Sequence, residues 1–96
     1  MHEAPMVAAL VAEAEAIVER ACVSPQQIGI TVGALSGMSP AAVRTHWRRL
    51  AGPLLQHAKL DIEVEDDRHA DLHAASTFGL VLSYVDVDVD VAERGV

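Results

Sequence analysis

The first three residues of the chain are of types that bind divalent metals. Met1 contributes an amino group, the peptide bonds that follow contribute amide nitrogens, and His2 contributes an imidazole. Deprotonated amide nitrogens suit the square-planar coordination of Ni(II) or Cu(II). Glu3 could add an oxygen ligand or orient the imidazole through a hydrogen bond. The opening tripeptide is therefore a candidate metal site, and an unstructured polar start is the alternative interpretation.

A second set of potential metal ligands lies within residues 66–73. His69 and His73 are four residues apart and are accompanied by three carboxylates. On a helix the two imidazoles would share one face and could bind a transition metal. Nothing in the sequence makes this stretch helical, so a solvated loop is the alternative.

Other reactive groups are sparse. The single cysteine, Cys22, excludes an intramolecular disulfide and a cysteine-based zinc ribbon, and we expect it to be a small buried hydrophobe. The segment 33–37 has two glycines but lacks the lysine and the spacing of a phosphate-binding loop. No nucleophile or acid–base pair stands out, so we do not expect an enzyme.

Composition limits the possible partners. The 96 residues suffice for one domain, and an apolar content of 51% favours a folded one. Residues 61–96 carry ten acidic and two basic side chains, a sum of −8. Such a surface disfavours nucleic acid and membrane partners. The chain has neither a basic secretory leader nor an apolar run of about 20 residues, so we expect a cytoplasmic location.

The elements that must position these residues follow from apolar spacing. Apolar side chains three and four apart predict a helix over 5–21. Alternation predicts strands over 27–33, 60–65 and 80–91, with a loop over 66–78. Ser39 as N-cap and Pro40 as the first helical residue predict a helix over roughly 40–51. The expected buried positions of the two helices are Val7, Leu10, Val11, Ala14, Ile17, Val18 and Ala21, then Val43, Trp47, Leu50 and Leu54.

The element order α-β-α-β-β predicts a small two-layer α+β domain. The strand at 27–33, the following helix and the strand at 60–65 form a β-α-β unit with parallel strands, and the last strand can pair antiparallel. This yields a three-stranded mixed sheet with two helices on one face. Gly29 and Gly33 fall on the other face, where we expect another backbone to approach closely. The long last strand could also be exchanged between chains in a homodimer.

Four segments together resemble the HypA/HybF family of nickel-incorporation proteins, which serve [NiFe]-hydrogenase and urease maturation. The segments are Met1-His2-Glu3 opening an alanine-rich helix, then the stretches 33–43, 58–64 and 82–87. The family's turn has a Gly-Glu-Leu-Ser-Gly pattern, and Gly33-Ala34-Leu35-Ser36-Gly37 is similar to it. The resemblance covers roughly residues 1–65 and 80–90 in the family's order.

The resemblance implies a metallochaperone. Nickel would be held by Met1 and His2, with Glu3 in support, and passed to a maturation GTPase and the hydrogenase large subunit. The family's zinc module of two Cys-x-x-Cys pairs is missing, and residues 66–79 stand in its place as a shortened loop, so we expect no structural zinc. Ala34 and Ser39 also replace carboxylates found in family members. A metal-free scaffold in hydrogenase assembly is therefore the main alternative, followed by an unrelated small α+β ligand-binding protein or enzyme.

Overall fold

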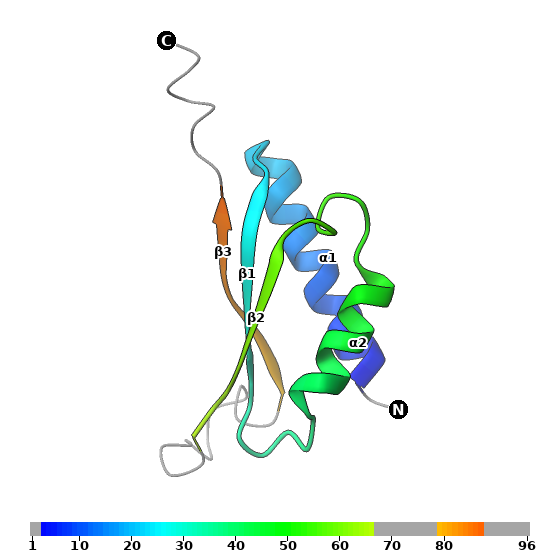
Figure 1. The fold of residues 1–96 in the computed structure, drawn as a ribbon, viewed down its shortest axis with the longest axis vertical. Helices are drawn as coiled ribbons and strands as arrows, with labels where there is room; N and C mark the ends of the chain where they lie inside the picture. The colour runs from blue at the N-terminus through cyan, green and yellow to red at the C-terminus, as the bar shows by residue number, and fades with distance from the viewer. Residues whose placement is uncertain (1–2, 67–78, 88–96) are drawn as a thin grey trace.

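The structure, a computed structural model, describes residues 3–66 and 79–87 (Figure 1). It confirms the predicted order of elements, with boundaries that move by at most two residues except at the end of the last strand. That strand was predicted over 80–91, and residues 88–91 lie outside the described part, as does most of the predicted loop at 66–78. The elements are α1 (Glu3–Ala21), β1 (Pro25–Val32), α2 (Pro40–Leu50), β2 (Lys59–Val64) and β3 (Leu80–Val87).

The three strands form one mixed sheet in the order β2-β1-β3. β1 pairs in parallel with β2 and antiparallel with β3, as the β-α-β unit and the returning strand predicted. Both helices cover the same face of the sheet (Figure 1). The chain is therefore a two-layer α+β domain, which confirms the predicted fold class.

The core lies between the sheet and the two helices. Alternation in β1 directs its three large apolar side chains to the helical layer, where they are at most 1% exposed. Ile17, which was predicted to be buried, is 36% exposed because it lies at the edge of the apolar stripe of α1, about 100° around the helix from Val18. Ala21, also predicted to be buried, is exposed at the last residue of the helix. The buried set comprises Val7, Leu10, Val11, Ala14, Val18, Ile28, Ile30, Val32, Val43, Trp47, Ala51 and Leu55.

The end of α2 differs from the prediction. Leu50 and Leu54 were expected in the buried stripe but are 40% and 43% exposed, whereas Leu55 is 1% exposed. The helix ends at Leu50, and the Leu55 amide donates to the Gly52 carbonyl at 3.0 Å in a turn that follows. Helical spacing no longer applies beyond that point, so the turn directs Leu55 into the core. Leu50 lies on the predicted face, but a face is buried only where another element covers it.

Cys22 is exposed, so its predicted burial is wrong. It adopts a left-handed conformation (φ 55°) immediately after α1. The Cys22 amide donates to the Glu19 carbonyl at 3.3 Å, and the Val23 amide donates to the Val18 carbonyl at 3.4 Å. This is the Schellman arrangement that ends many helices, in which glycine usually takes the left-handed position. The position turns the chain towards β1 and leaves the thiol in solvent.

Candidate metal-binding site

The start of α1 positions the predicted nickel ligands. Met1 and His2 lie outside the described residues, and Glu3 is the first residue of the helix. Pro5 lies in the first turn, where its missing amide hydrogen is not needed. Val7 and Leu10 are buried, so the helix is packed against the rest of the domain within two turns of its start. The tripeptide is thus attached to a firmly packed element.

The connection from β1 to α2, residues 33–39, lies at the same end of the molecule as the start of α1 (Figure 1). The Ser36 amide donates to the Gly33 carbonyl at 3.1 Å, and the Ser36 hydroxyl accepts from the Met38 amide at 3.2 Å. Gly37 has φ 77°, a conformation that glycine adopts without strain. The turn that carried part of the family resemblance is therefore well defined, and it lies at the same end of the protein as the start of α1 (Figure 1).

A carboxylate that the sequence did not single out holds this turn. The Glu65 side chain accepts a hydrogen bond from the Ala34 amide at 3.1 Å. The backbone amide of Glu65 donates to the Val32 carbonyl at 2.9 Å. This hydrogen bond continues the pairing of β1 with the chain beyond the end of β2. The turn thus has a carboxylate from just beyond β2, although its own residue 34 is an alanine. The only signal for this contact is the parallel register of Val32 with Val64, which the sequence does not specify.

A polar row crosses the face of the sheet opposite the helices. The Tyr84 hydroxyl donates to Asp61 at 2.8 Å and accepts from the Gln27 amide group at 2.8 Å. The hydrogen bond to Asp61 raises the pKa of Tyr84 above its ordinary value, with smaller contributions from desolvation and from the charge of Asp61. A methyl group on Gly29 would overlap the Tyr84 ring. The close approach expected at Gly29 is therefore made by an aromatic ring and not by another backbone.

The remaining predicted ligands do not assemble into a site in the described structure. His69 and His73 lie outside the described residues, so a second metal site there stays a prediction. The other two histidines of the chain were not predicted to be ligands: His46 is half-buried on α2 and His57 is exposed after it. Within residues 3–66 and 79–87, no three His, Cys, Asp or Glu side chains come together as a metal ion would require. A metal site of that kind would need residues beyond this part of the chain.

Comparisons with known proteins identify the fold. No protein-family model and no curated protein sequence matches the chain. The solution structure of the Ni metallochaperone HypA from Helicobacter pylori matches with a TM-score of 0.73 and 14% identity, over 91% of this chain and 97% of that one. A second solution structure of HypA protein matches with a TM-score of 0.64 and 18% identity, over 92% of this chain and 97% of that one.

These matches show that the chain has a HypA-like α+β fold. They confirm at the level of the fold the resemblance found in the sequence, because both solved structures match over almost their whole length. None of the helices in the described residues is long and apolar enough to cross a membrane.

Proposed function

We propose that this chain is a nickel metallochaperone, a short member of the HypA/HybF family that binds Ni(II) through its first residues. The observation that carries the proposal is the combination of a HypA-like fold with Met1-His2-Glu3 at the start of α1. One of the similar solved structures is that of a Ni metallochaperone. The likeness in fold and the chemistry of the tripeptide are independent, and both favour the same cargo.

The donor set suits nickel as a transferable ion. The amino group of Met1, the following amide nitrogens and the imidazole of His2 can form a planar set of nitrogen ligands. The amine and the amides must lose protons and the imidazole must be neutral, so affinity rises with pH. Glu3 can hydrogen-bond the imidazole or supply an oxygen. A site on a chain end is easily reached by a second protein, which favours transfer over permanent storage.

The fold provides a small rigid body that carries this end. Val7 and Leu10 fix the first turns of α1 in the core, and residues 33–39 face the same end of the molecule. We infer that this end contacts the recipient of nickel, either the hydrogenase large subunit or the maturation GTPase. The role is binding and delivery of a metal and requires no catalytic group.

The proposal is tested by Ni(II) calorimetry on protein whose chain begins at Met1. We expect one Ni(II) per chain and an absorbance spectrum of square-planar nickel. The variant His2→Ala and an N-terminal extension of a few residues should each abolish this binding. His57→Ala is the matched control, because it removes an exposed imidazole elsewhere and should leave binding unchanged. Unchanged stoichiometry and affinity in His2→Ala would refute the N-terminal site.

A metal-free scaffold is the second candidate. The single cysteine, Cys22, is exposed at the end of α1, so the chain has no counterpart of the family's paired cysteines. If protein with its amino group intact takes up no Ni(II) but copurifies with a hydrogenase component, the scaffold replaces the chaperone as the function.

A further inference from the structure

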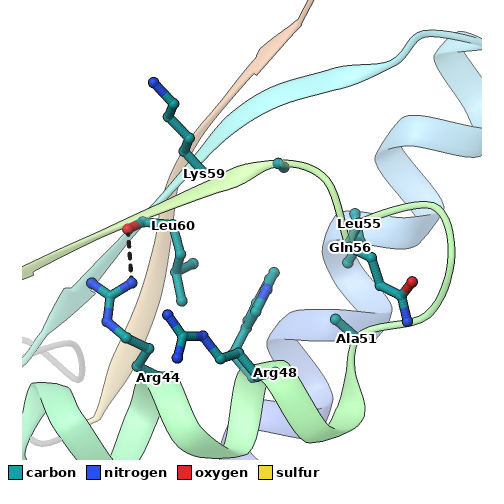
Figure 2. A pocket seen from close by; sticks show the side chains of 9 residues that line it. Arg44, Arg48, Ala51, Leu55, Gln56, Lys59 and Leu60 are labelled. Atoms are coloured by element: carbon teal, nitrogen blue, oxygen red, sulfur yellow. Dashed lines mark hydrogen bonds between the residues drawn. The ribbon is translucent and has the colours of Figure 1, made fainter.

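A cavity of about 510 Å³ opens between α2 and the beginning of β2, and two arginine side chains border it (Figure 2). Arg44 and Arg48 extend from the helix, whereas Lys59, the first residue of the strand, lines the cavity but points its side chain away from α2 (Figure 2). Trp47 and Leu60 add apolar surface, and no acidic residue lines the cavity. A cationic cavity is notable in a chain whose formal charge is −7.

Local structure explains why the basic groups converge. Arg44 and Arg48 are four residues apart and therefore lie on one side of α2. The Arg44 guanidinium donates to the Leu60 carbonyl at 3.3 Å, which bridges helix and strand at the cavity (Figure 2). Trp47 is only 3% exposed, so it anchors this side of the helix to the core. The cationic groups are thus held on a rigid support.

These cations have no acidic partner in the described structure. Among residues 3–66 and 79–87, no carboxylate forms an ion pair with Arg44, Arg48 or Lys59. Arg48 is exposed at the rim, so its guanidinium remains free to bind an external anion. At physiological ionic strength charges are screened over about 8 Å, so the two guanidinium groups that border the cavity act more strongly on a ligand there than charges beyond that distance.

We propose that this cavity binds the phosphate group of a small phosphorylated metabolite. A phosphate monoester carries roughly −1.5 to −2 charges at neutral pH and three acceptor oxygens, which matches several converging donors. Guanidinium groups bind such oxygens in pairs. The cavity falls within the range of small-molecule sites, about 300–1,000 Å³, and so has room for an organic group beside the phosphate. This site is independent of the nickel proposal.

The surrounding charge selects against larger polyanions. Residues 61–96 sum to −8, which repels nucleic acid and an anionic membrane surface. A small phosphate ester avoids most of that repulsion because it fits within the cavity. An acidic peptide offers singly charged carboxylates, each of which pairs with one guanidinium, whereas one phosphate presents three oxygens and up to two charges to both guanidinium groups at once.

The experiment titrates the protein with glycerol phosphate and with inorganic phosphate at constant ionic strength set with chloride. Trp47 lines the cavity and is the single tryptophan of the chain, so its fluorescence reports binding directly. We expect saturable binding, with Arg48→Gln weakening it by about fivefold, since this removes a charge-assisted contact at an exposed site. Lys59→Gln should change it much less, because the Lys59 side chain points away from the cavity (Figure 2). Arg49→Gln is the matched control, because Arg49 has the same charge on the same helix but does not line the cavity.

Each remaining outcome overturns the proposal. An absence of saturable binding would show that the cavity takes no phosphate. An equal loss in Arg49→Gln would show that the effect is nonspecific electrostatics. Tighter binding of a short poly-glutamate peptide than of glycerol phosphate would assign the cavity to an acidic protein segment. Binding to vesicles of anionic lipid that depends on Arg48 would assign it to a membrane. Circular dichroism of the variants checks that the exposed substitutions leave the fold intact.

Discussion

Replacing Gly29 with alanine tests the packing on the open face of the sheet. Gly29 lies on the central strand, and Tyr84 is directly opposite it on β3. An added methyl group would meet Cζ of the Tyr84 ring at 2.7 Å and two other ring carbons more closely. The ring must therefore move, and movement breaks its hydrogen bonds to Gln27 and Asp61.

The expected cost follows from two opposing effects. Forcing a methyl group into filled space costs about 1–3 kcal/mol, and the exposed ring can swing towards solvent, which favours the lower half of that range. Alanine also restricts the unfolded chain, which stabilises the protein by about 0.4–1 kcal/mol where the backbone conformation allows it. The net expectation for Gly29→Ala is a loss of about 1 kcal/mol in the free energy of unfolding, or roughly 4–8 °C in Tm.

The assay is urea unfolding followed by the fluorescence of Trp47, performed on a double-mutant cycle with Tyr84→Ser. Without the ring the space above Gly29 is open, so Gly29→Ala should then stabilise the protein by about 0.4–1 kcal/mol. The sign of the same substitution is thus expected to reverse between the two backgrounds. A Gly29→Ala variant that is neutral or stabilising in the wild-type background would refute the reasoning, because it would mean that the ring does not occupy this space.

Three further predictions concern single contacts. Leu55→Ala should lower the free energy of unfolding by about 2–5 kcal/mol, whereas Leu54→Ala should change it by less than about 0.5 kcal/mol, as measured by urea unfolding. Cys22→Gly should raise it by about 1 kcal/mol, measured by thermal unfolding, because glycine adopts the left-handed conformation without strain. Asp61→Asn should lower the pKa of Tyr84 towards its ordinary value, measured from the ultraviolet absorbance of this single tyrosine.

The pH dependence of stability follows from the same tyrosine. The pKa of Tyr84 is higher in the folded protein than in the unfolded chain, so the folded state favours the neutral phenol. The stabilisation is complete below the unfolded pKa, and it is lost as pH rises through the folded pKa. A wild-type phenol that titrates at or below its ordinary pKa would contradict the hydrogen bond to Asp61.

The outcomes that would contradict the other two predictions are equally direct. Equal effects of Leu54→Ala and Leu55→Ala would mean that the turn after α2 does not redirect the chain. A destabilising Cys22→Gly would mean that the residue does not hold a left-handed position at the end of α1.

Local signals predicted most of the fold. Ser39 and Pro40 define the start of α2, and the alternation of Ile28, Ile30 and Val32 defines the buried face of β1. Such patterns act over a few residues and depend little on the rest of the chain, which is why the elements and their order were predictable. The same local reasoning failed at Leu54, where Pro53 and the turn interrupt the helical period.

The candidate sites differ in how much of each could be predicted from the sequence. The tripeptide Met1-His2-Glu3 is contiguous, so its ligand chemistry could be predicted directly from the sequence. Met1 and His2 lie outside the described residues, so nickel binding stays a proposal. The cavity between α2 and β2 could not be predicted from the sequence. Arg44 and Arg48 are four residues apart on α2, but nothing in their spacing indicated that the start of β2 would lie opposite them and complete a cavity.

The sequence by itself determined the helices, the strands, their order and the donor atoms of the first residues, because these depend on side-chain period, end-capping and covalent order. Only the tertiary structure decided that Glu65 holds the turn at Ala34, that Tyr84 covers Gly29 and that Arg44 reaches across a cavity to β2. Each of these contacts joins residues that are distant in the chain. Strand register and helix packing bring them together, and both are set by the burial of the whole core.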